Sequence, residues 1–204
     1  MSIEAVIFDF GNVLGFFSHQ KAIRQLMAYA PEGTSAEAVL AFAMEIEHRF
    51  ELGELSGPEV LAMLRERFAL RGADEELAHA LGDMFTPNPP ICELVPRLAG
   101  RYRLGLLSNT NEVHYALFRR QFASVLDRFD HVIVSHEVRL RKPDPALFGY
   151  AQARFGLPAE RMLFVDDLPA NVEGARRCGW QGIVYTSPEA LVARLKELGV
   201  TLAG

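Results

Sequence analysis

The chain has 204 residues, half of them hydrophobic, which is enough for one substantial core or for a core with a small accessory domain. A formal net charge of −5, without a basic stripe, argues against a nucleic-acid partner. The sequence shows neither the pattern of a signal peptide nor an uncharged stretch of the ~18 residues that suggest a membrane span, so we expect a cytoplasmic protein that does not enter a membrane. The two cysteines, Cys92 and Cys178, lack the spacing of a zinc site or of a disulfide framework.

A short apolar run at residues 5–8 is the first predicted strand. A long helical interval follows, roughly over residues 16–88. Within this interval, the S/T-x-x-E spacing that begins at Thr34 and again at Ser56 indicates two helix starts. The proline-rich segment 87–90 closes the interval and is typical of an extended hinge or linker.

Strands and helices alternate over the rest of the chain. The predicted strands lie near residues 103–107, 131–135, 162–165 and 182–185, and the predicted helices at 114–122, 145–155, 169–178 and 188–198. Such alternation is typical of a parallel sheet covered by helices. We therefore predict an α/β fold with a Rossmann-like core of residues 1–15 and 89–204 around a five-stranded parallel sheet. A helical cap of residues 16–88 is inserted after the first strand and should lie over the ligand end of the sheet.

Several predicted strands end on polar side chains that can take part in chemistry. Asp9 follows the first strand, Ser108 follows the second, and Asp166 and Asp167 follow the strand near 162–165. Because ligands of open α/β sheets bind beyond the carboxyl ends of the strands, these side chains should line one crevice. Each of them alone is also explained as a turn or capping residue, but their coincidence favours a site.

Asp9 is the candidate nucleophile, because a carboxylate fixed at a strand end can attack phosphorus and form an acyl-phosphate. Asp166 and Asp167 are adjacent carboxylates, which repel each other unless a cation compensates them. Mg²⁺ prefers oxygen ligands and is the expected compensator, with Asp9 as a further ligand. Lys142 could neutralise a carboxylate or a phosphoryl oxygen, and Ser108 could donate its hydroxyl to one, although a solvated lysine and a serine turn are the simpler explanations.

Together these residues resemble the four motifs of the haloacid dehalogenase superfamily. That family has a strand ending in a nucleophilic Asp, then a Ser or Thr after a strand, a Lys, and an acidic pair or Gly-Asp. All four motifs occur in order between residue 3 and about residue 186, as Asp9, Ser108, Lys142 and Asp166-Asp167. Each motif alone is a weak signal, whereas four in order on four strands are specific.

The resemblance implies a role for each residue that matches a motif. It implies that Asp9 and Asp167 bind Mg²⁺ through their side chains and Gly11 through its carbonyl, with Asp166 behind these ligands. Asp9 and Lys142 would be the catalytic residues. The substrate would be bound by Ser108, Asn109 and Lys142.

The sequence departs from the family pattern at Gly11. Most phosphatases of the superfamily carry an Asp two residues after the nucleophile, which protonates the leaving group and then activates water. Without it, a contribution of ~10²–10⁴-fold from acid–base catalysis is missing. Three explanations are open: a leaving group that departs with little protonation, such as an anomeric oxygen; a substitute such as His19, His114 or a cap residue; or loss of catalysis.

Finer similarity favours the first explanation. Four short segments resemble a bacterial branch that includes α-D-glucose-1-phosphate phosphatases, which have the same glycine. These segments are residues 8–13, 108–111 and 164–167, and residues 51–56 in the inserted segment. Haloacid dehalogenases also lack the second Asp, and Asn109 is similar to theirs. In the cap, His48, Arg49 and Glu51 could face the substrate, although a solvated helix face explains them more simply.

We therefore predict a Mg²⁺-dependent phosphatase that hydrolyses a small phosphorylated metabolite, such as a sugar phosphate, through an aspartyl-phosphate on Asp9. The protein is expected to be a monomer or a weak homodimer. One alternative is a 2-haloacid dehalogenase, in which Asp9 forms an ester with carbon and no metal is needed. The other is a binding domain that kept the fold without catalysis, which the retention of Asp9, Ser108, Lys142 and the acidic pair disfavours.

Overall fold

The predicted strands form a parallel sheet in the computed structural model, which describes residues 2–203. They are β1 (Ala5–Phe8), β4 (Arg103–Ser108), β5 (His131–Val134), β6 (Met162–Asp166) and β7 (Gln181–Val184). Across this five-stranded sheet the order is β5-β4-β1-β6-β7, and every neighbouring pair is parallel. The predicted α/β fold is confirmed. Because β1 is the middle strand, the residue after it lies at the centre of the carboxyl edge.

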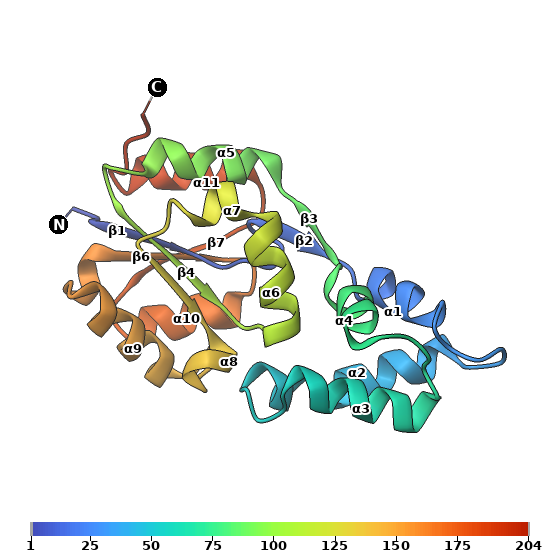
Figure 1. Ribbon diagram of the computed structural model, residues 1–204. Helices are drawn as coiled ribbons and strands as arrows, with labels where there is room; N and C mark the ends of the chain where they lie inside the picture. Colours follow the sequence, from blue (N-terminus) through green and yellow to red (C-terminus); the bar gives the residue numbers. More distant parts are fainter. Residues whose placement is uncertain (1, 204) are drawn as a thin grey trace.

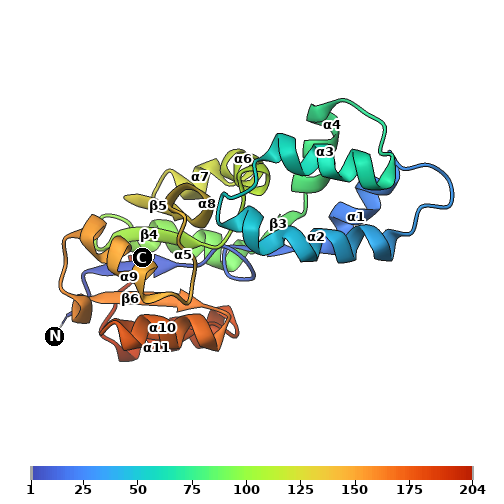
Figure 2. The ribbon, with the colours of Figure 1, turned by 90° about the horizontal axis from the view of Figure 1, so that it is seen from below.

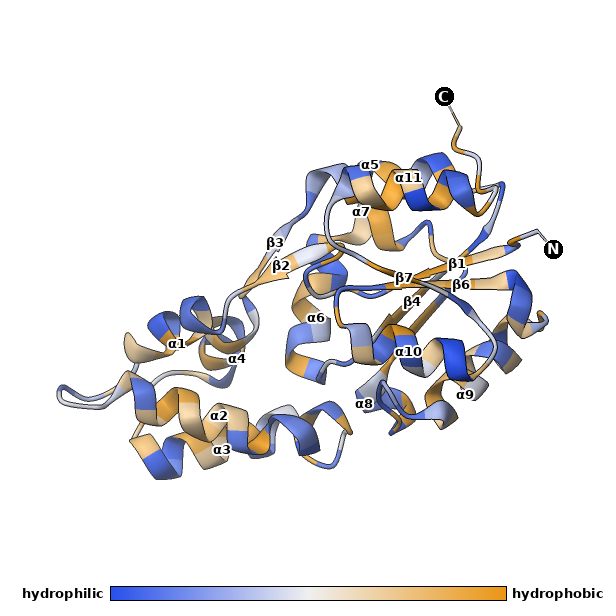
Figure 3. Cartoon of the chain, turned by 180° about the vertical axis from the view of Figure 1, so that it is seen from behind, coloured by the Kyte–Doolittle hydropathy of each residue, from blue (hydrophilic) through white to orange (hydrophobic). Residues whose placement is uncertain are grey.

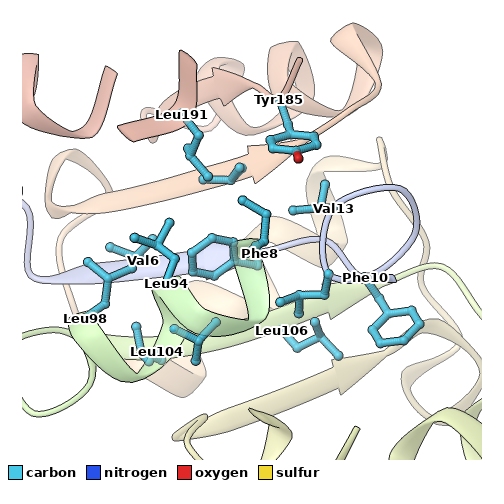
Figure 4. Packing of buried hydrophobic residues seen from close by; sticks show 14 of the residues in the cluster. Val6, Phe8, Phe10, Val13, Leu94, Leu98, Leu104, Leu106, Tyr185 and Leu191 are labelled. Carbon is cyan, nitrogen blue, oxygen red and sulfur yellow. The ribbon is translucent and has the colours of Figure 1, made fainter. Parts of the chain in front are cut away.

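Helices cover both faces of the sheet (Figure 1). One face carries α5 (Pro89–Leu98) and α11 (Pro188–Glu197), and the other carries α9 (Pro145–Phe155) and α10 (Pro169–Arg177). Successive strand residues point to opposite faces, so Val6 and Phe8 pack with Leu94 and Leu191 on the α5 side (Figure 4). Strand β1 is buried on both sides, which explains its uninterrupted apolar sequence.

Residues 16–88, between β1 and α5, contain four helices with a hydrophobic core of their own. These are α1 (His19–Met27), α2 (Ala36–Glu51), α3 (Gly57–Phe68) and α4 (Asp74–Gly82). Leu26, Phe42, Phe50, Leu64 and Leu77 are among the buried side chains that they share. Figure 2 shows these helices as a lobe beyond one end of the sheet, with α2 and α3 side by side. The position of this helical cap agrees with an insertion that leaves from the ligand end.

Two short antiparallel strands, β2 (Gly15–Phe17) and β3 (Phe85–Pro87), connect the cap to the sheet. Between β4 and α9 lie α6 (Glu112–Gln121), α7 (Ala123–Leu126) and α8 (Ser135–Val138), and a 3₁₀ turn, Ala159–Arg161, precedes β6. Helix α6 bridges the two parts, because Val113 packs into the core of the cap and Phe118 into the core of the sheet. The central strands are mostly orange in Figure 3, in keeping with their burial, whereas polar residues dominate the outer helix faces.

Two expectations from the sequence need correction. The second cap helix is capped by Ser35, whose side chain accepts from the Ala38 amide, because the Thr34 hydroxyl is engaged with the Pro31 carbonyl. Segment 87–90 is not an extended linker: β3 ends within it and two prolines open α5, where their missing N–H groups cost nothing. Ser56 does begin a helix, with a complete capping box. The domain boundaries after residues 15 and 88 stay a prediction.

No helix in the described part of the chain, residues 2–203, is both long and apolar enough to pass through a membrane.

Candidate active site

A cavity of about 270 Å³ lies at the carboxyl edge of the sheet, under the cap. The sequence-predicted site residues all line it: Asp9, Gly11, Ser108, Asn109, Lys142 and Asp167. Phe17, His19, Glu47 and Glu51 contribute from β2, α1 and α2. The strand ends therefore meet as expected. The cavity lies between these strand ends and residues of the cap, so a bound substrate would contact both.

Lys142 is the electrostatic centre of the site. Its Nζ lies 2.6 Å from Asp9 Oδ1 and 2.7 Å from Asp166 Oδ2, and all three residues are buried. Burial alone would lower the pKa of Lys142, but the two carboxylates outweigh this effect and raise it. Burial raises the pKa of Asp9 to about 7, against the lowering effect of Lys142. The lysine is thus a fixed positive charge beside the candidate nucleophile and not a solvated surface residue.

The acidic pair divides into two different environments. Asp166 Oδ1 accepts from the Leu168 amide at 2.8 Å and Oδ2 accepts from Lys142, and the Asn171 side chain donates to both oxygens. Asp167 is half-buried, and its Oδ2 accepts from Asn12 at 3.0 Å. Both oxygens of Asp166 are therefore already engaged, which leaves Asp167 as the freer ligand.

The site suits a divalent cation. Asp9, Asp166 and Asp167 each place a carboxylate oxygen within 4.8 Å of the other two, with Lys142 as the one cation in contact with Asp9 and Asp166 among the described residues. Three carboxylates beside a single lysine leave an excess of negative charge, and oxygen is the ligand atom that Mg²⁺ prefers. The donor set therefore fits Mg²⁺.

The side chain of Asn109 holds the backbone of Lys142, a contact that the amino-acid sequence did not indicate. Its side-chain Oδ1 accepts from the Lys142 amide at 2.8 Å, and its Nδ2 donates to the Lys142 carbonyl at 3.0 Å. These two bonds hold the backbone of the lysine against the end of β4. Ser108 is buried at the same strand end, and its assignment to substrate binding, like that of Asn109, stays a prediction.

At Gly11 the aromatic ring of Phe17 fills the space that a side chain would need. A Cβ atom added to Gly11 would lie 3.3 Å from Phe17 Cε1. That separation is tight, so the ring would have to give way to any larger residue. The missing acid–base carboxylate is thus replaced in space by an apolar ring on β2.

The side of the cavity formed by the cap contains charged residues. One of them, Glu47, was not predicted from the sequence as a site residue. Arg141 Nη2, from the loop before Lys142, lies 2.6 Å from Glu51 Oε2, and its Nη1 contacts His48. Burial raises the pKa of Glu51 to about 7, although Arg141 opposes this. Glu47 and Glu51 are four residues apart and so share one face of α2, a signal that the sequence contained.

The two histidines proposed as substitutes at Gly11 have different surroundings. His114 is held by the Asn111 side chain, which donates to Nδ1 at 3.0 Å, and its ring packs edge-on against Phe85 with the centroids 5.8 Å apart. Burial, aided by the charge of His19, lowers the pKa of His114 to about 4. His19 is half-buried, and its Nε2 lies 3.5 Å from Glu47 Oε1.

The parallel sheet, the inserted cap, the strand-end aspartate and the lysine between carboxylates define a capped α/β hydrolase. Residues 3–179 match the model of the haloacid dehalogenase-like hydrolases. The chain belongs to this family, as the motifs indicated.

Similar proteins extend over most of the chain. The phosphoserine phosphatase of Thermus thermophilus is 33% identical over 213 residues, which cover 92% of this chain and 85% of that protein. The (S)-2-haloacid dehalogenase H-109 of Pseudomonas putida is 27% identical, and the match covers 97% of this chain and 95% of that protein. A solved structure of a haloacid dehalogenase family enzyme from Bacteroides thetaiotaomicron, in complex with magnesium and inorganic phosphate, superposes with a TM-score of 0.80 at 21% sequence identity. The match covers 91% of this chain and 95% of that one. This likeness shows the shared fold.

Proposed function

We propose that this protein is a cytoplasmic, Mg²⁺-dependent phosphatase of a small phosphorylated metabolite, and that the metabolite is a sugar phosphate. The observation that carries the proposal is the buried Lys142, 2.6 Å from Asp9 at the sheet edge where Ser108 and Asp167 also lie. A nucleophile, a fixed cation, a hydroxyl donor and an acidic cluster are what phosphoryl transfer through an aspartyl-phosphate needs. A phosphatase among the relatives and a bound magnesium and phosphate in a structural neighbour agree with it.

The proposed reaction has two steps. Asp9 attacks phosphorus in line with the departing oxygen, which gives an aspartyl-phosphate and frees the alcohol. Lys142 and Ser108 hold phosphoryl oxygens during this transfer. Water then attacks phosphorus, releases inorganic phosphate and regenerates Asp9. Mg²⁺, bound by Asp9, Asp167 and the Gly11 carbonyl, would neutralise negative charge on the phosphoryl group.

The lining of the cavity supports a polar, hydroxylated leaving group. The cavity, at about 270 Å³, lies near the lower end of small-molecule sites and so fits a metabolite. Glu47 and Arg141 offer hydrogen bonds to hydroxyl groups, and the buried Nε of Arg141 has no hydrogen-bond partner within residues 2–203. The ring of Phe17 offers an apolar face to sugar carbons. In this proposal residues 16–88 form the cap that selects the substrate, and residues 1–15 and 89–204 form the catalytic core.

A dehalogenase is the rival reaction, and a dehalogenase is also among the relatives. The acidic cluster beside Asp9 favours the phosphatase, because an ester between Asp9 and carbon needs no metal. A screen of phosphate monoesters, with and without Mg²⁺, beside chloride release from 2-chloro acids, decides between them. Chloride release unaffected by EDTA would establish the dehalogenase, and no turnover of either substrate class by folded protein with bound Mg²⁺ would favour the binding domain.

Asp167→Asn is expected to weaken Mg²⁺ binding more than Asp166→Asn does. Asp167 has the freer oxygen, whereas both oxygens of Asp166 are engaged by Lys142, Asn171 and Leu168. Isothermal titration with Mg²⁺ measures both affinities, and removal of the metal with EDTA should stop phosphate release by the unmodified protein. A larger loss in Asp166→Asn, with both variants folded, would exchange the two assignments.

The affinity for Mg²⁺ is also expected to depend on pH. Burial raises the pKa of Asp9 to about 7, so below that pH the carboxyl carries a proton that the metal has to displace. The association constant should therefore fall by about tenfold for each pH unit below about 7 and level off above it. Titrations on both sides of this pH measure the effect. Asp9→Asn, which has no carboxyl to deprotonate, should bind weakly and lose the pH dependence; equal pH dependence in both proteins would assign the proton to another group.

A further inference from the structure

The proposed reaction needs a proton for the departing oxygen, and Gly11 cannot supply it. A residue that replaces the missing carboxylate has to be a polar group on the same side of the cavity as Gly11. Phe17 lies directly against Gly11, 3.3 Å from the position of an added Cβ, and its ring centroid is 5.2 Å from that of His19. His19 thus follows Gly11 and Phe17 along one wall of the cavity. Both His19 and Glu47 line this cavity, on the cap side where the leaving group would be bound.

The other candidate, His114, is unsuited to move protons. The Asn111 side chain donates to its Nδ1, the half-buried ring packs edge-on against Phe85, and burial lowers its pKa to about 4. At neutral pH, a histidine with a pKa near 4 carries no second proton that it could give to a leaving group.

His19 has the arrangement expected of an acid–base group. It lies at the first position of α1, with about a third of its side chain exposed, and its Nε2 is 3.5 Å from Glu47 Oε1. A histidine with one nitrogen beside a carboxylate is oriented by that carboxylate and keeps its other nitrogen for the reaction. Glu51 and Arg141 also line the cavity and complete the charged surroundings of the pair, and His114 lies beside them as a neutral ring.

We propose that His19 is the acid–base residue that replaces the missing carboxylate at Gly11, and that Glu47 positions its ring. This inference rests on the proposed phosphatase function. It assigns proton transfer to the cap, so that the leaving group is protonated only where the cap has closed over it.

The protons balance over the two steps. As the bond between phosphorus and the leaving oxygen breaks, protonated His19 gives its proton to that oxygen, and the alcohol leaves with Asp9 phosphorylated. Neutral His19 then takes a proton from the water that attacks phosphorus. Inorganic phosphate leaves, Asp9 is a free carboxylate again, and His19 is protonated for the next turnover.

His19→Gln tests the proposal, with His79→Gln as the matched control, since His79 is an exposed histidine of the cap that does not line this cavity. The measured quantity is kcat/KM for 4-nitrophenyl phosphate, whose leaving group needs no proton, and for phenyl and alkyl phosphates, whose leaving groups do. His19→Gln should lower kcat/KM for the alkyl phosphates by ~10²–10⁴-fold and for 4-nitrophenyl phosphate by far less. His79→Gln should follow the unmodified protein throughout.

A second signature separates proton transfer from simple substrate binding. Because the variant lacks the base for the water step, the aspartyl-phosphate should accumulate. 4-Nitrophenyl phosphate should then give a burst of one nitrophenolate per protein, followed by slow turnover. Glu47→Gln should change the rates in the same direction but less, and Glu45→Gln, on the exposed face of the same helix, should change neither.

Two outcomes overturn the inference, and they are distinguishable. If the ratio of rates on good and poor leaving groups is the same in His19→Gln and in the unmodified protein, His19 donates no proton, while the phosphatase function stands. If the unmodified protein hydrolyses no phosphate ester, 4-nitrophenyl phosphate included, the proposed function fails and the role of His19 fails with it. Circular dichroism of each variant confirms that the fold is intact.

Discussion

Asp9→Asn is expected to abolish the hydrolysis of every phosphate ester, with a loss on the order of 10⁴-fold or more. The amide has the shape of the carboxylate but cannot attack phosphorus. Lys142 keeps its contact with Asp166 at 2.7 Å, so the fold should persist. Phosphate release in the presence of Mg²⁺ measures the loss.

The control for this variant is Asp127→Asn, an exposed aspartate that pairs with Arg119 at 2.7 Å on the protein surface. It should retain full activity. Beryllofluoride, which mimics a phosphoryl group on a carboxylate, should bind the unmodified protein with Mg²⁺ and should not bind Asp9→Asn. Full activity in cleanly purified Asp9→Asn would remove Asp9 as the nucleophile.

Lys142→Met is expected to lower the free energy of unfolding by about 3–5 kcal/mol in the absence of Mg²⁺. The substitution leaves Asp9 and Asp166 buried without the cation that both contact. Unpaired buried carboxylates bind protons more readily in the folded protein than in the unfolded chain, so the deficit should shrink as the pH falls and be largest at neutral pH. Urea denaturation over a range of pH measures it.

Mg²⁺ should restore part of the stability of Lys142→Met, because it binds the folded form and compensates the same carboxylates. Activity should stay low, since the charge held against the phosphoryl group is gone. Lys196→Met, at an exposed position on α11, should change neither quantity. Equal stability of Lys142→Met and the unmodified protein at neutral pH, without metal, would mean that the lysine does not offset the repulsion.

The strand ends could be predicted from the sequence, because a buried parallel strand is a short uninterrupted apolar run and the residue after it has a known place in the fold. Asp9, Ser108 and Asp166 were located in this way. The same logic placed the cap, since a helical interval after the first strand has to leave from the carboxyl edge.

Contacts between distant loops could not be predicted. Asn109 and Lys142 are 33 positions apart, and nothing in either loop shows that one side chain holds the backbone of the other. Glu47 was missed for a related reason: a polar residue on an amphipathic helix is normally solvated, and the cavity beside it exists only once the cap has folded onto the sheet. Helix ends also depend on neighbouring residues, because the N-terminus of α2 is capped by Ser35 and not by the predicted Thr34.

The pairing of β2 with β3 also affects the order in which the chain can fold. Phe8 and Leu106 pair in the sheet but are far apart in sequence, and contacts of that kind slow folding because a long loop has to close first. Once Phe17 pairs with Phe85, the two ends of the inserted segment are held together. The loop that still has to close between β1 and β4 then consists only of the short stretches before β2 and after β3. A cap that forms early therefore brings the central strands together, so the segment that covers the cavity also shortens the search for the native sheet.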